Sequence, residues 1–297
     1  MTRVAAIVGP TAVGKSEASL DVAERLGAEI VSVDSMQMYR GMDIGTDKAT
    51  AEMRFRVPHH LLDVKDPDEE LSVAEFQALA RAAIADIESR GRVPLLAGGS
   101  GLYLRAAIDD LDFPPRSEEV RAALEEEAAD IGPEALHARL RERDPAAASR
   151  IEPRNTRRTI RALEVIELTG RPFSDADAWE RYESVYDVRI AGLERDRDEL
   201  FDRIDQRVAE MLDAGLVAEA VELDRRGLGR TARQALGYRQ VLDAPNAAPD
   251  ELRADIVRAT KRFARRQLSW FRADPRVTWF DASAPGLTDR LTAFLAD

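Results

Sequence analysis

The feature that most constrains the fold is an octapeptide that matches the pattern G-x-x-x-x-G-K-[ST], Gly9-Pro10-Thr11-Ala12-Val13-Gly14-Lys15-Ser16. It follows an apolar run at residues 4–8 and precedes residues 17–26, which have a helical period. A strand, a glycine-rich loop and a helix in this order place backbone N–H groups and the positive end of a helix dipole where anionic oxygens can bind. The order predicts an α/β fold whose first loop binds phosphate groups.

The specified residues of this loop pattern have distinct expected roles. Gly9 and Gly14 allow the backbone to fold around a phosphate, and Lys15 can neutralise its terminal oxygens. The hydroxyl of Ser16 is placed to ligate Mg²⁺. The motif recognises a diphosphate and does not by itself identify a nucleotide.

Composition excludes several classes of protein. The 297 residues include no cysteine, which rules out a disulfide framework and a thiolate metal site, and only three histidines. The net charge of −12 argues against binding nucleic acid over the whole surface, because such binding depends on neutralising phosphates. Arginines nevertheless gather in residues 150–161 and 252–272, so a polyanion could contact two restricted patches.

No stretch of the chain predicts a membrane segment. Residues 1–3 lead directly into the first predicted strand, which leaves no signal peptide. No apolar run approaches the roughly 20 residues needed to span a bilayer. We therefore expect a soluble, cytoplasmic protein, and nothing in the sequence requires more than a monomer.

The second candidate for function is Asp34, which follows a β-branched run at residues 29–33. The carboxyl ends of parallel strands line one crevice, so Asp34 is expected to face the same cleft as the phosphate loop. The alternative is a helix cap, a role that Ser35 would share. Residues 36–46 have neither a helical nor a strand period and predict a loop that faces the substrate.

Two further strands are predicted at residues 59–64 and 93–97, with a helix at 73–89 between them. His59 and His60 would point to opposite faces of their strand, so we expect structural roles and no metal ligation. The strand at 93–97 runs out into glycines and Ser100. The Ser100 hydroxyl could contact a ligand in the cleft or stabilise a turn.

Residues 117–169 are highly charged, helical in pattern and poor in strand formers. They predict an all-helical lobe at residues 116–185, inserted into a catalytic core of residues 1–115 and 186–297. The core is predicted to be a P-loop NTPase-like parallel sheet flanked by helices. The last helix of the lobe carries three arginines that either bind a polyanion or pair with Glu164 and Glu167, namely Arg157, Arg158 and Arg161.

Beyond the lobe, the sheet is expected to resume at residues 188–193 and to end at 277–280. A helix at 200–212 would carry Arg203 and Arg207 one turn apart. A long helix through residues 261–272 places Phe263 and Trp270 seven residues apart on one face, so we expect both in the core.

Several separated stretches together resemble the bacterial tRNA dimethylallyltransferase family, also called tRNA isopentenyltransferases. The resemblance covers nearly the full length and rests on residues 9–16, 34–46, 58–63, 98–103, 157–165, 235–240 and 265–268. The chain departs from the family pattern at Ser100, where many members have threonine, and at Arg157, where glutamine is common.

The resemblance implies transfer of the dimethylallyl group from dimethylallyl diphosphate to N6 of adenosine 37, beside the anticodon of tRNA, with Mg²⁺. Residues 9–16 would hold the diphosphate, and Ser16 would ligate the metal. Lys15 and Arg207 would offset the charge of the leaving group, with Arg203 as the second choice. Asp34 would act as general base, and Ser100 would orient it or the substrate.

The resemblance also implies a set of contacts with the anticodon stem-loop, in which the lobe clasps the stem. The residues concerned are Asp34, Ser35, Met36, Gln37, Ser100, Arg157, Arg158, Arg161, Gln234, Gly237, Tyr238 and Arg239.

Two other classes of protein share the phosphate loop. A nucleotide or small-molecule kinase would bind ATP there and could use residues 117–169 as a lid. A regulator would bind phosphate without chemistry.

Overall fold

A computed structural model describes residues 2–175 and 181–296. The chain divides into two compact units, one formed by the chain up to Asp109 and from Ser184 onward, the other by Asp110–Glu183. The division lies close to the predicted lobe boundaries at 116 and 185.

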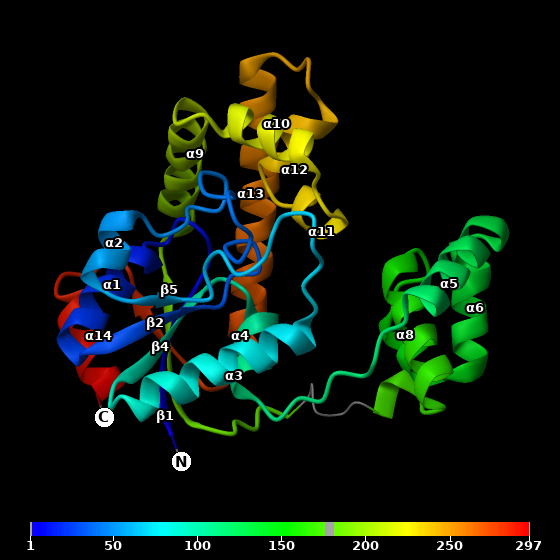
Figure 1. Ribbon diagram of the computed structural model, residues 1–297, viewed down its shortest axis with the longest axis horizontal. Helices are drawn as coiled ribbons and strands as arrows, with labels where there is room; N and C mark the ends of the chain where they lie inside the picture. The colour runs from blue at the N-terminus through cyan, green and yellow to red at the C-terminus, as the bar shows by residue number, and fades with distance from the viewer. Residues whose placement is uncertain (1, 176–180, 297) are drawn as a thin grey trace. The chain divides into compact units, whose positions relative to one another are not determined.

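The first unit contains a parallel sheet with the strand order β3-β2-β4-β1-β5-β6 (Figure 1). This arrangement confirms the predicted fold class. Its strands are β1 Arg3–Val8, β2 Ala28–Ser32, β3 His59–His60, β4 Val93–Gly98, β5 Asp187–Glu194 and β6 Val277–Asp281.

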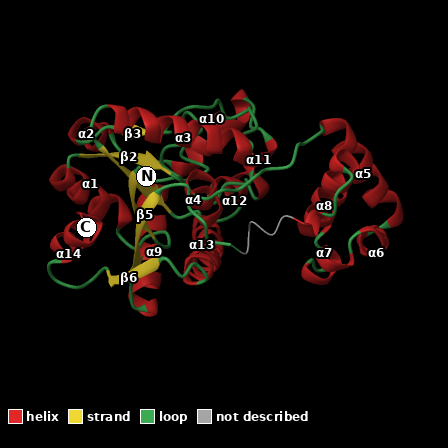
Figure 2. Ribbon diagram, turned by 90° about the horizontal axis from the view of Figure 1, so that it is seen from below, coloured by secondary structure: helices red, strands yellow, loops and turns green. Residues whose placement is uncertain are grey.

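Helices cover both faces of this sheet, as parallel strands require (Figure 2). Helices α1 and α14 pack together on one face, and α4 and α13 lie over the other. The helices of the first unit are α1 Lys15–Leu26, α2 Ala51–Arg56, α3 Val73–Ser89, α4 Gly101–Ile108, α9 Arg197–Asp213, α10 Leu216–Arg226, α11 Arg230–Arg233, α12 Tyr238–Asp243, α13 Pro249–Arg272 and α14 Leu287–Ala296.

Strand β1 lies in the middle of the sheet because it is apolar on both faces. Residues 4–8 are fully or almost fully buried, and the strand pairs with β4 on one side and β5 on the other. In this register Val8 aligns with Gly98 and Gly192, so the phosphate loop leaves the sheet level with the turn after β4. The carboxyl ends of these strands therefore meet at one edge.

The predicted strand at residues 59–64 is wrong beyond its first two residues. Leu61 and Asp63 have φ angles of 63° and 57°, in the left-handed region that a strand cannot contain. The Asp63 carboxylate accepts hydrogen bonds from buried Lys48 and from Arg54, each at 2.7 Å. These ion pairs hold the chain in a turn at the point where the sequence pattern favours an extended strand.

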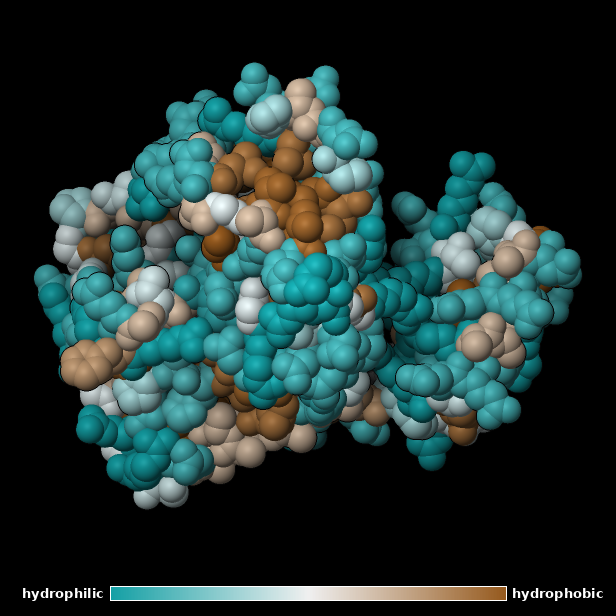
Figure 3. All heavy atoms as spheres, turned by 45° about the horizontal axis from the view of Figure 1, so that its top comes forward, coloured by the Kyte–Doolittle hydropathy of each residue, from teal (hydrophilic) through white to brown (hydrophobic). Residues whose placement is uncertain are grey.

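The second unit has a hydrophobic core of its own. Its helices are α5 Glu118–Ile131, α6 Pro133–Arg143, α7 Pro145–Arg150 and α8 Thr156–Thr169, followed by the 3₁₀ turn Phe173–Asp175. Leu124, Leu136, Leu140 and Leu163 pack together in its centre. The surface drawn in Figure 3 is largely hydrophilic over both units, with a broader apolar area on the first. Within residues 2–175 and 181–296, no helix combines the length and apolar character that crossing a bilayer requires.

Candidate active site

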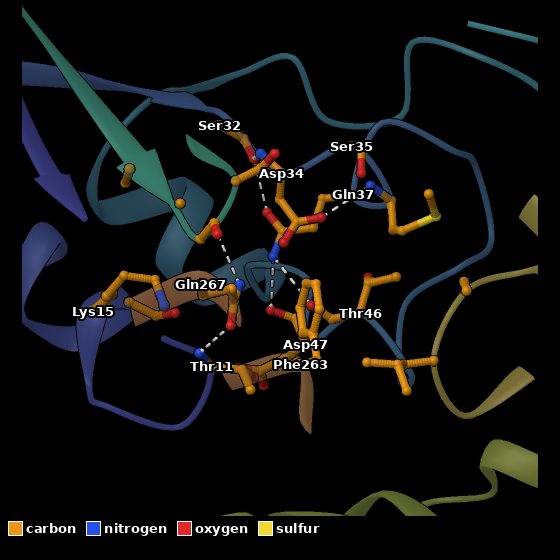
Figure 4. Close-up of a pocket in the computed structure, with 18 of the residues that line it drawn as sticks. Thr11, Lys15, Ser32, Asp34, Ser35, Gln37, Thr46, Asp47, Phe263 and Gln267 are labelled. Atoms are coloured by element: carbon orange, nitrogen blue, oxygen red, sulfur yellow. Dashed lines mark hydrogen bonds between the residues drawn. The ribbon is translucent and has the colours of Figure 1, made fainter. Parts of the chain in front are cut away.

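A cavity of about 650 Å³ opens at the edge of the sheet where β1, β2 and β4 end. Figure 4 shows side chains from several separate segments around it. The structure brings to this cavity the following residues that the sequence singled out: Thr11, Lys15, Ser16, Asp34, Ser35, Met36, Gln37, Ser100, Arg207, Gln234 and Arg239.

The phosphate loop has the backbone geometry that its two glycines predict. Gly9 has a φ of 151°, and a Cβ there would lie 2.6 Å from the carbonyl oxygen of Leu193. Gly14 has a φ of 104° and directly precedes α1. Both positions therefore require glycine, because any larger residue would clash or strain the backbone.

The phosphate loop contributes one cation to the cavity, Lys15. Its Nζ donates to the carbonyl oxygen of Pro10 at 2.7 Å. Burial and the nearby Arg207 guanidinium lower the pKa of Lys15 to about 8, against the opposing attraction of Asp34 and Asp47. The ammonium is poorly solvated, so an anionic ligand would restore much of the charge stabilisation that burial removes.

Of the two candidate arginines on α9, the structure places only Arg207 in the cavity lining. Its Nη1 lies 3.2 Å from Oδ2 of Asp47. Arg203 instead donates through Nε to the carbonyl oxygen of Ala12 at 2.9 Å. Arg195 donates to the carbonyl oxygen of Val13 at 3.0 Å. Arg203 and Arg195 therefore fix the backbone of the loop from outside the cavity.

Asp34 stands on a different wall of the cavity from Lys15 (Figure 4). Its Oδ1 accepts a hydrogen bond from the backbone N–H of Met36 at 2.9 Å. No helix begins there, so the helix-cap alternative is wrong. Within residues 2–175 and 181–296, no group donates a hydrogen bond to Oδ2, which leaves that oxygen able to accept a proton from a ligand.

Gln37 joins the Asp34 turn to the next loop. Its Oε1 accepts from the hydroxyl of Ser32 at 2.9 Å, and its Nε2 donates to the carbonyl oxygens of Thr46 and Asp47 at 3.2 Å each. The side-chain amide is thus bonded within the protein, and Gln37 positions the cavity wall.

Of the two roles that the sequence left open for Ser100, the structure shows the local one at the start of α4, and contact with a ligand stays a prediction. Ser100 lines the cavity, and it caps α4 by accepting a hydrogen bond from the N–H of Tyr103 at 3.5 Å. The neighbouring Gly98 and Gly99 are tightly packed, since a Cβ on either would lie within 2.7 Å of Val33 or 2.2 Å of Gln267. Backbone atoms therefore form this part of the wall.

Gln267 lines the candidate site, although the sequence analysis gave it no role beyond its place in the family-like stretch at residues 265–268. Its side chain is buried in the cavity wall, where Oε1 accepts from the N–H of Thr11 at 2.9 Å and Nε2 donates to the carbonyl oxygen of Gly99 at 2.8 Å (Figure 4). One amide thus joins the phosphate loop to the turn after β4. The available signal was a polar residue at an inward position of α13, between the buried Ala264 and Phe271.

The prediction that Phe263 and Trp270 belong to the core is wrong. Both line the cavity, and Trp270 is 48% exposed. Arg262 and Arg266 line the cavity from the same helix, and the Arg266 guanidinium lies 5.7 Å from the centre of the Phe263 ring. The seven-residue spacing of Phe263 and Trp270 thus identifies the side of α13 that faces the cavity. Arginines lie on this side together with the aromatic residues.

Several predicted contacts lie outside this cavity. Tyr238 is completely buried, and its hydroxyl donates to Glu219 at 2.6 Å. Gly237 comes directly before it.

In the second unit, Arg157 and Arg158 are exposed. Arg161 contacts Glu164 at 2.9 Å and the carbonyl oxygens of Pro114 and Pro115, so its guanidinium takes the ion-pairing alternative.

The paired histidines have structural contacts. His60 bonds to buried Glu29 at 2.7 Å, and His59 bonds to the carbonyl oxygen of Val57 at 2.7 Å. In the described part of the chain, no group of three or more histidine, aspartate or glutamate side chains is arranged to hold a metal ion.

Comparison with known proteins identifies the relatives of this chain. Residues 37–274 match the IPP transferase family, and residues 2–64 match the isopentenyl transferase family. The tRNA dimethylallyltransferase of Streptomyces avermitilis is 55% identical over 97% of this chain and 93% of its own length. That of Thermobifida fusca is 53% identical over 100% of this chain and 95% of its own length.

Solved structures extend the similarity to three dimensions. The full-length tRNA isopentenylpyrophosphate transferase of Bacillus halodurans is 44% identical, with a TM-score of 0.73 over 100% of this chain and 96% of that protein. A eukaryotic dimethylallyltransferase acting on tRNA is 25% identical, with a TM-score of 0.83 over 100% of this chain and 78% of that protein. The cavity also brings a phosphate loop and a carboxylate together. Matches of this extent establish that the chain belongs to the tRNA dimethylallyltransferase family.

Proposed function

We propose that this protein transfers the dimethylallyl group of dimethylallyl diphosphate to N6 of adenosine 37 in tRNA. The C–O bond to the diphosphate breaks, a C–N6 bond forms, and a proton leaves the amine. The observation that carries the proposal is that Lys15, Arg207 and Asp34 line one cavity of about 650 Å³. Two cations suit a departing diphosphate, and a carboxylate suits the proton.

The diphosphate would bind at the backbone N–H groups of the phosphate loop and the start of α1. Lys15 and Arg207 would stabilise the negative charge that grows on it as the C–O bond breaks. Because these groups are already held by Pro10 and Asp47, little reorganisation is needed.

Mg²⁺ fits this site as a partner of the diphosphate. The Ser16 hydroxyl lines the cavity, and the described residues offer no carboxylate cluster that would bind the ion alone. Mg²⁺ usually takes few protein ligands and completes its shell with phosphate oxygens and water. When bound, the ion would neutralise charge on the leaving group.

The acceptor amine would approach Asp34, whose Oδ2 would receive the N6 proton. Reaching the cavity requires the adenine to leave its stack, which in an anticodon loop costs only a few kcal/mol. Gln234 and Arg239 line the same cavity and would contact the neighbouring nucleotides.

We further propose that the exposed Arg157 and Arg158 bind phosphates of the anticodon stem. We also propose that the enzyme acts as a monomer, because Lys15, Arg207 and Asp34 line one cavity within the first unit. We place it in the cytoplasm, where its tRNA substrate is found.

The test is to incubate the protein with unmodified tRNA, Mg²⁺ and either dimethylallyl diphosphate or ATP. We expect prenylated adenosine and diphosphate from the first mixture, detected by nucleoside mass spectrometry. Release of ADP from the second mixture, with no prenylated adenosine from the first, would instead identify a kinase. No product from either mixture would favour a regulator that only binds phosphate.

A further inference from the structure

Glu219 of α10 binds the backbone of a loop that belongs to the cavity wall. Its carboxylate accepts hydrogen bonds from the N–H groups of Asp43 at 3.2 Å, Ile44 at 3.0 Å and Gly45 at 3.3 Å. The hydroxyl of the buried Tyr238 donates to the same carboxylate at 2.6 Å. One side chain thus gathers four donors from two distant segments.

The contact is close enough to fix the backbone of the loop. A Cβ on Gly45 would lie 2.3 Å from a ring carbon of Tyr238 and 2.9 Å from Leu216. Burial and the carboxylate of Glu219 raise the pKa of the Tyr238 hydroxyl. The hydroxyl therefore keeps its proton and donates its hydrogen bond at any physiological pH. The loop therefore has no room to shift toward α10 or α12.

The residues that follow in this loop connect the Glu219 contact to the proposed diphosphate site. Gly45, Thr46 and Asp47 line the cavity, and Asp47 pairs with Arg207 at 3.2 Å. The carbonyl oxygens of Thr46 and Asp47 accept from Gln37, which continues the network toward Ser32. A displacement at residue 45 would reach Arg207 through one ion pair.

We infer that Glu219 is a positioning residue for the transfer reaction, because it sets the loop that orients Arg207 toward the leaving diphosphate. It does not line the cavity itself. The inference rests on the proposed function, since it assigns Arg207 to the departing group. Hydrogen bonds to an ionised acceptor are about twice as strong as neutral ones, which suits a carboxylate to this task.

The test compares the steady-state kinetics of Glu219→Gln with those of the wild type, using dimethylallyl diphosphate and tRNA. The amide retains the shape but loses the charge and one acceptor oxygen. We expect kcat to fall roughly tenfold to a hundredfold, the scale of a small misplacement of a catalytic group. The KM for dimethylallyl diphosphate should change by less than about twofold, because the phosphate loop still binds the ground state.

The matched control is Glu222→Gln, which removes an exposed carboxylate from the same helix and should leave kcat at the wild-type value. Thermal unfolding of each variant separates mispositioning from loss of fold. If Glu219→Gln is unfolded at the assay temperature, Tyr238→Phe replaces it, and a smaller fall in kcat with unchanged KM is expected.

The outcomes are distinguishable. A wild-type enzyme without transfer activity would defeat the proposed function. An active wild type with an equally active, folded Glu219→Gln would defeat the positioning role, and so would a change confined to KM. If Tyr238→Phe is the variant tested, a kcat equal to that of the wild type would also contradict the inference.

Discussion

Lys15 is a cation held where its charge is disfavoured, and this makes ligand binding dependent on pH. Burial and Arg207 lower the pKa of Lys15 to about 8. Bound diphosphate would raise that pKa, because opposite charges favour the protonated form. Below pH 8 the ammonium is present before binding, whereas above pH 8 a proton must be taken up with the ligand.

We predict that the Kd of dimethylallyl diphosphate rises up to about tenfold per pH unit above pH 8, as linkage to one proton requires. Stability of the empty protein should respond in the opposite sense. Between pH 8 and the usual pKa of lysine, the unfolded chain binds more protons at Lys15 than the folded protein does. Lys15 therefore makes the free energy of unfolding rise with pH in this range. Isothermal titration calorimetry from pH 7 to pH 9.5 measures the binding.

Lys15→Arg is the control, because arginine stays protonated throughout this range. Its affinity for dimethylallyl diphosphate should be nearly flat with pH. The same slope in both proteins would mean that another group takes up the proton.

Asp34→Asn tests the proposed base with little disturbance of structure. The amide oxygen of asparagine can still accept from the N–H of Met36, so the turn is retained. We predict a loss of transfer rate of about 10²- to 10⁴-fold. The affinity for dimethylallyl diphosphate should remain close to the wild-type value. Single-turnover assays and calorimetry measure the two quantities.

The control for this substitution is Asp86→Asn, which alters an exposed carboxylate on α3, outside the cavity. It should transfer at the wild-type rate. An Asp34→Asn enzyme that matched it would remove Asp34 from the chemistry.

At the scale of elements, α13 closes the cavity by joining two loops that come from different strands. Gln267 satisfies both the N–H of Thr11 and the carbonyl oxygen of Gly99. We predict that Gln267→Leu lowers the free energy of unfolding by about 1–3 kcal/mol for each group left unpaired. It should also weaken dimethylallyl diphosphate binding, because Thr11 belongs to the phosphate loop. Urea denaturation and calorimetry provide the measurements.

Gln206→Leu, at an exposed position of α9, is the comparison for this prediction. A Gln267→Leu protein no less stable than Gln206→Leu would show that water replaces both hydrogen bonds.

Local patterns in the sequence predicted most elements of the core. The apolar run of β1, the glycines that follow it and the helical period of residues 73–89 depend on neighbouring residues alone. The pattern at residues 61–64 was misleading, because ion pairs between Lys48, Arg54 and Asp63 decide the backbone there. Those partners lie 15 and 9 residues away from Asp63, beyond the four to eight residues from which a strand is predicted.

The candidate site was predictable where a strand end or a motif marks it, as at Lys15 and Asp34. Gln267 could not be placed from sequence patterns, because its two partners lie 256 and 168 residues away. Glu219 could not be predicted for the same reason, because its hydrogen bonds to residues 43–45 span more than 170 residues of the chain. Amphipathic spacing on α13 identified a buried face but could not tell a core from a cavity.

At the scale of the whole molecule, the insertion leaves and returns at one point of the first unit. Asp109 and Ser184 form an antiparallel bridge, and the hydroxyl of Ser184 donates to the carbonyl oxygen of Ile108 at 2.9 Å. The carboxylate of Asp109 is fully buried and bonds to Arg105 at 2.7 Å. The second unit is thus an insertion with its own core.

We predict that Arg158→Ala weakens tRNA binding at physiological salt and reduces the slope of log K against log salt by about 1, as loss of one phosphate contact requires. Arg161→Ala should instead destabilise the second unit, because it removes a partner of the buried Glu164. Filter binding over a range of salt concentrations, together with thermal unfolding, separates the two effects. An unchanged salt slope in Arg158→Ala would contradict the phosphate contact.

The pairing of β1 with β5 has a consequence for how the protein is made. A ribosome adds about 5–20 residues per second, so β1 and β4 leave it well before β5, the strand that pairs with the other edge of β1. Throughout synthesis of Asp110–Glu183, the nascent chain carries β1 with one edge uncovered. The inserted helices have a core of their own that can form without β5, whereas the hydrogen bond between Thr11 and Gln267 requires α13 to be translated first.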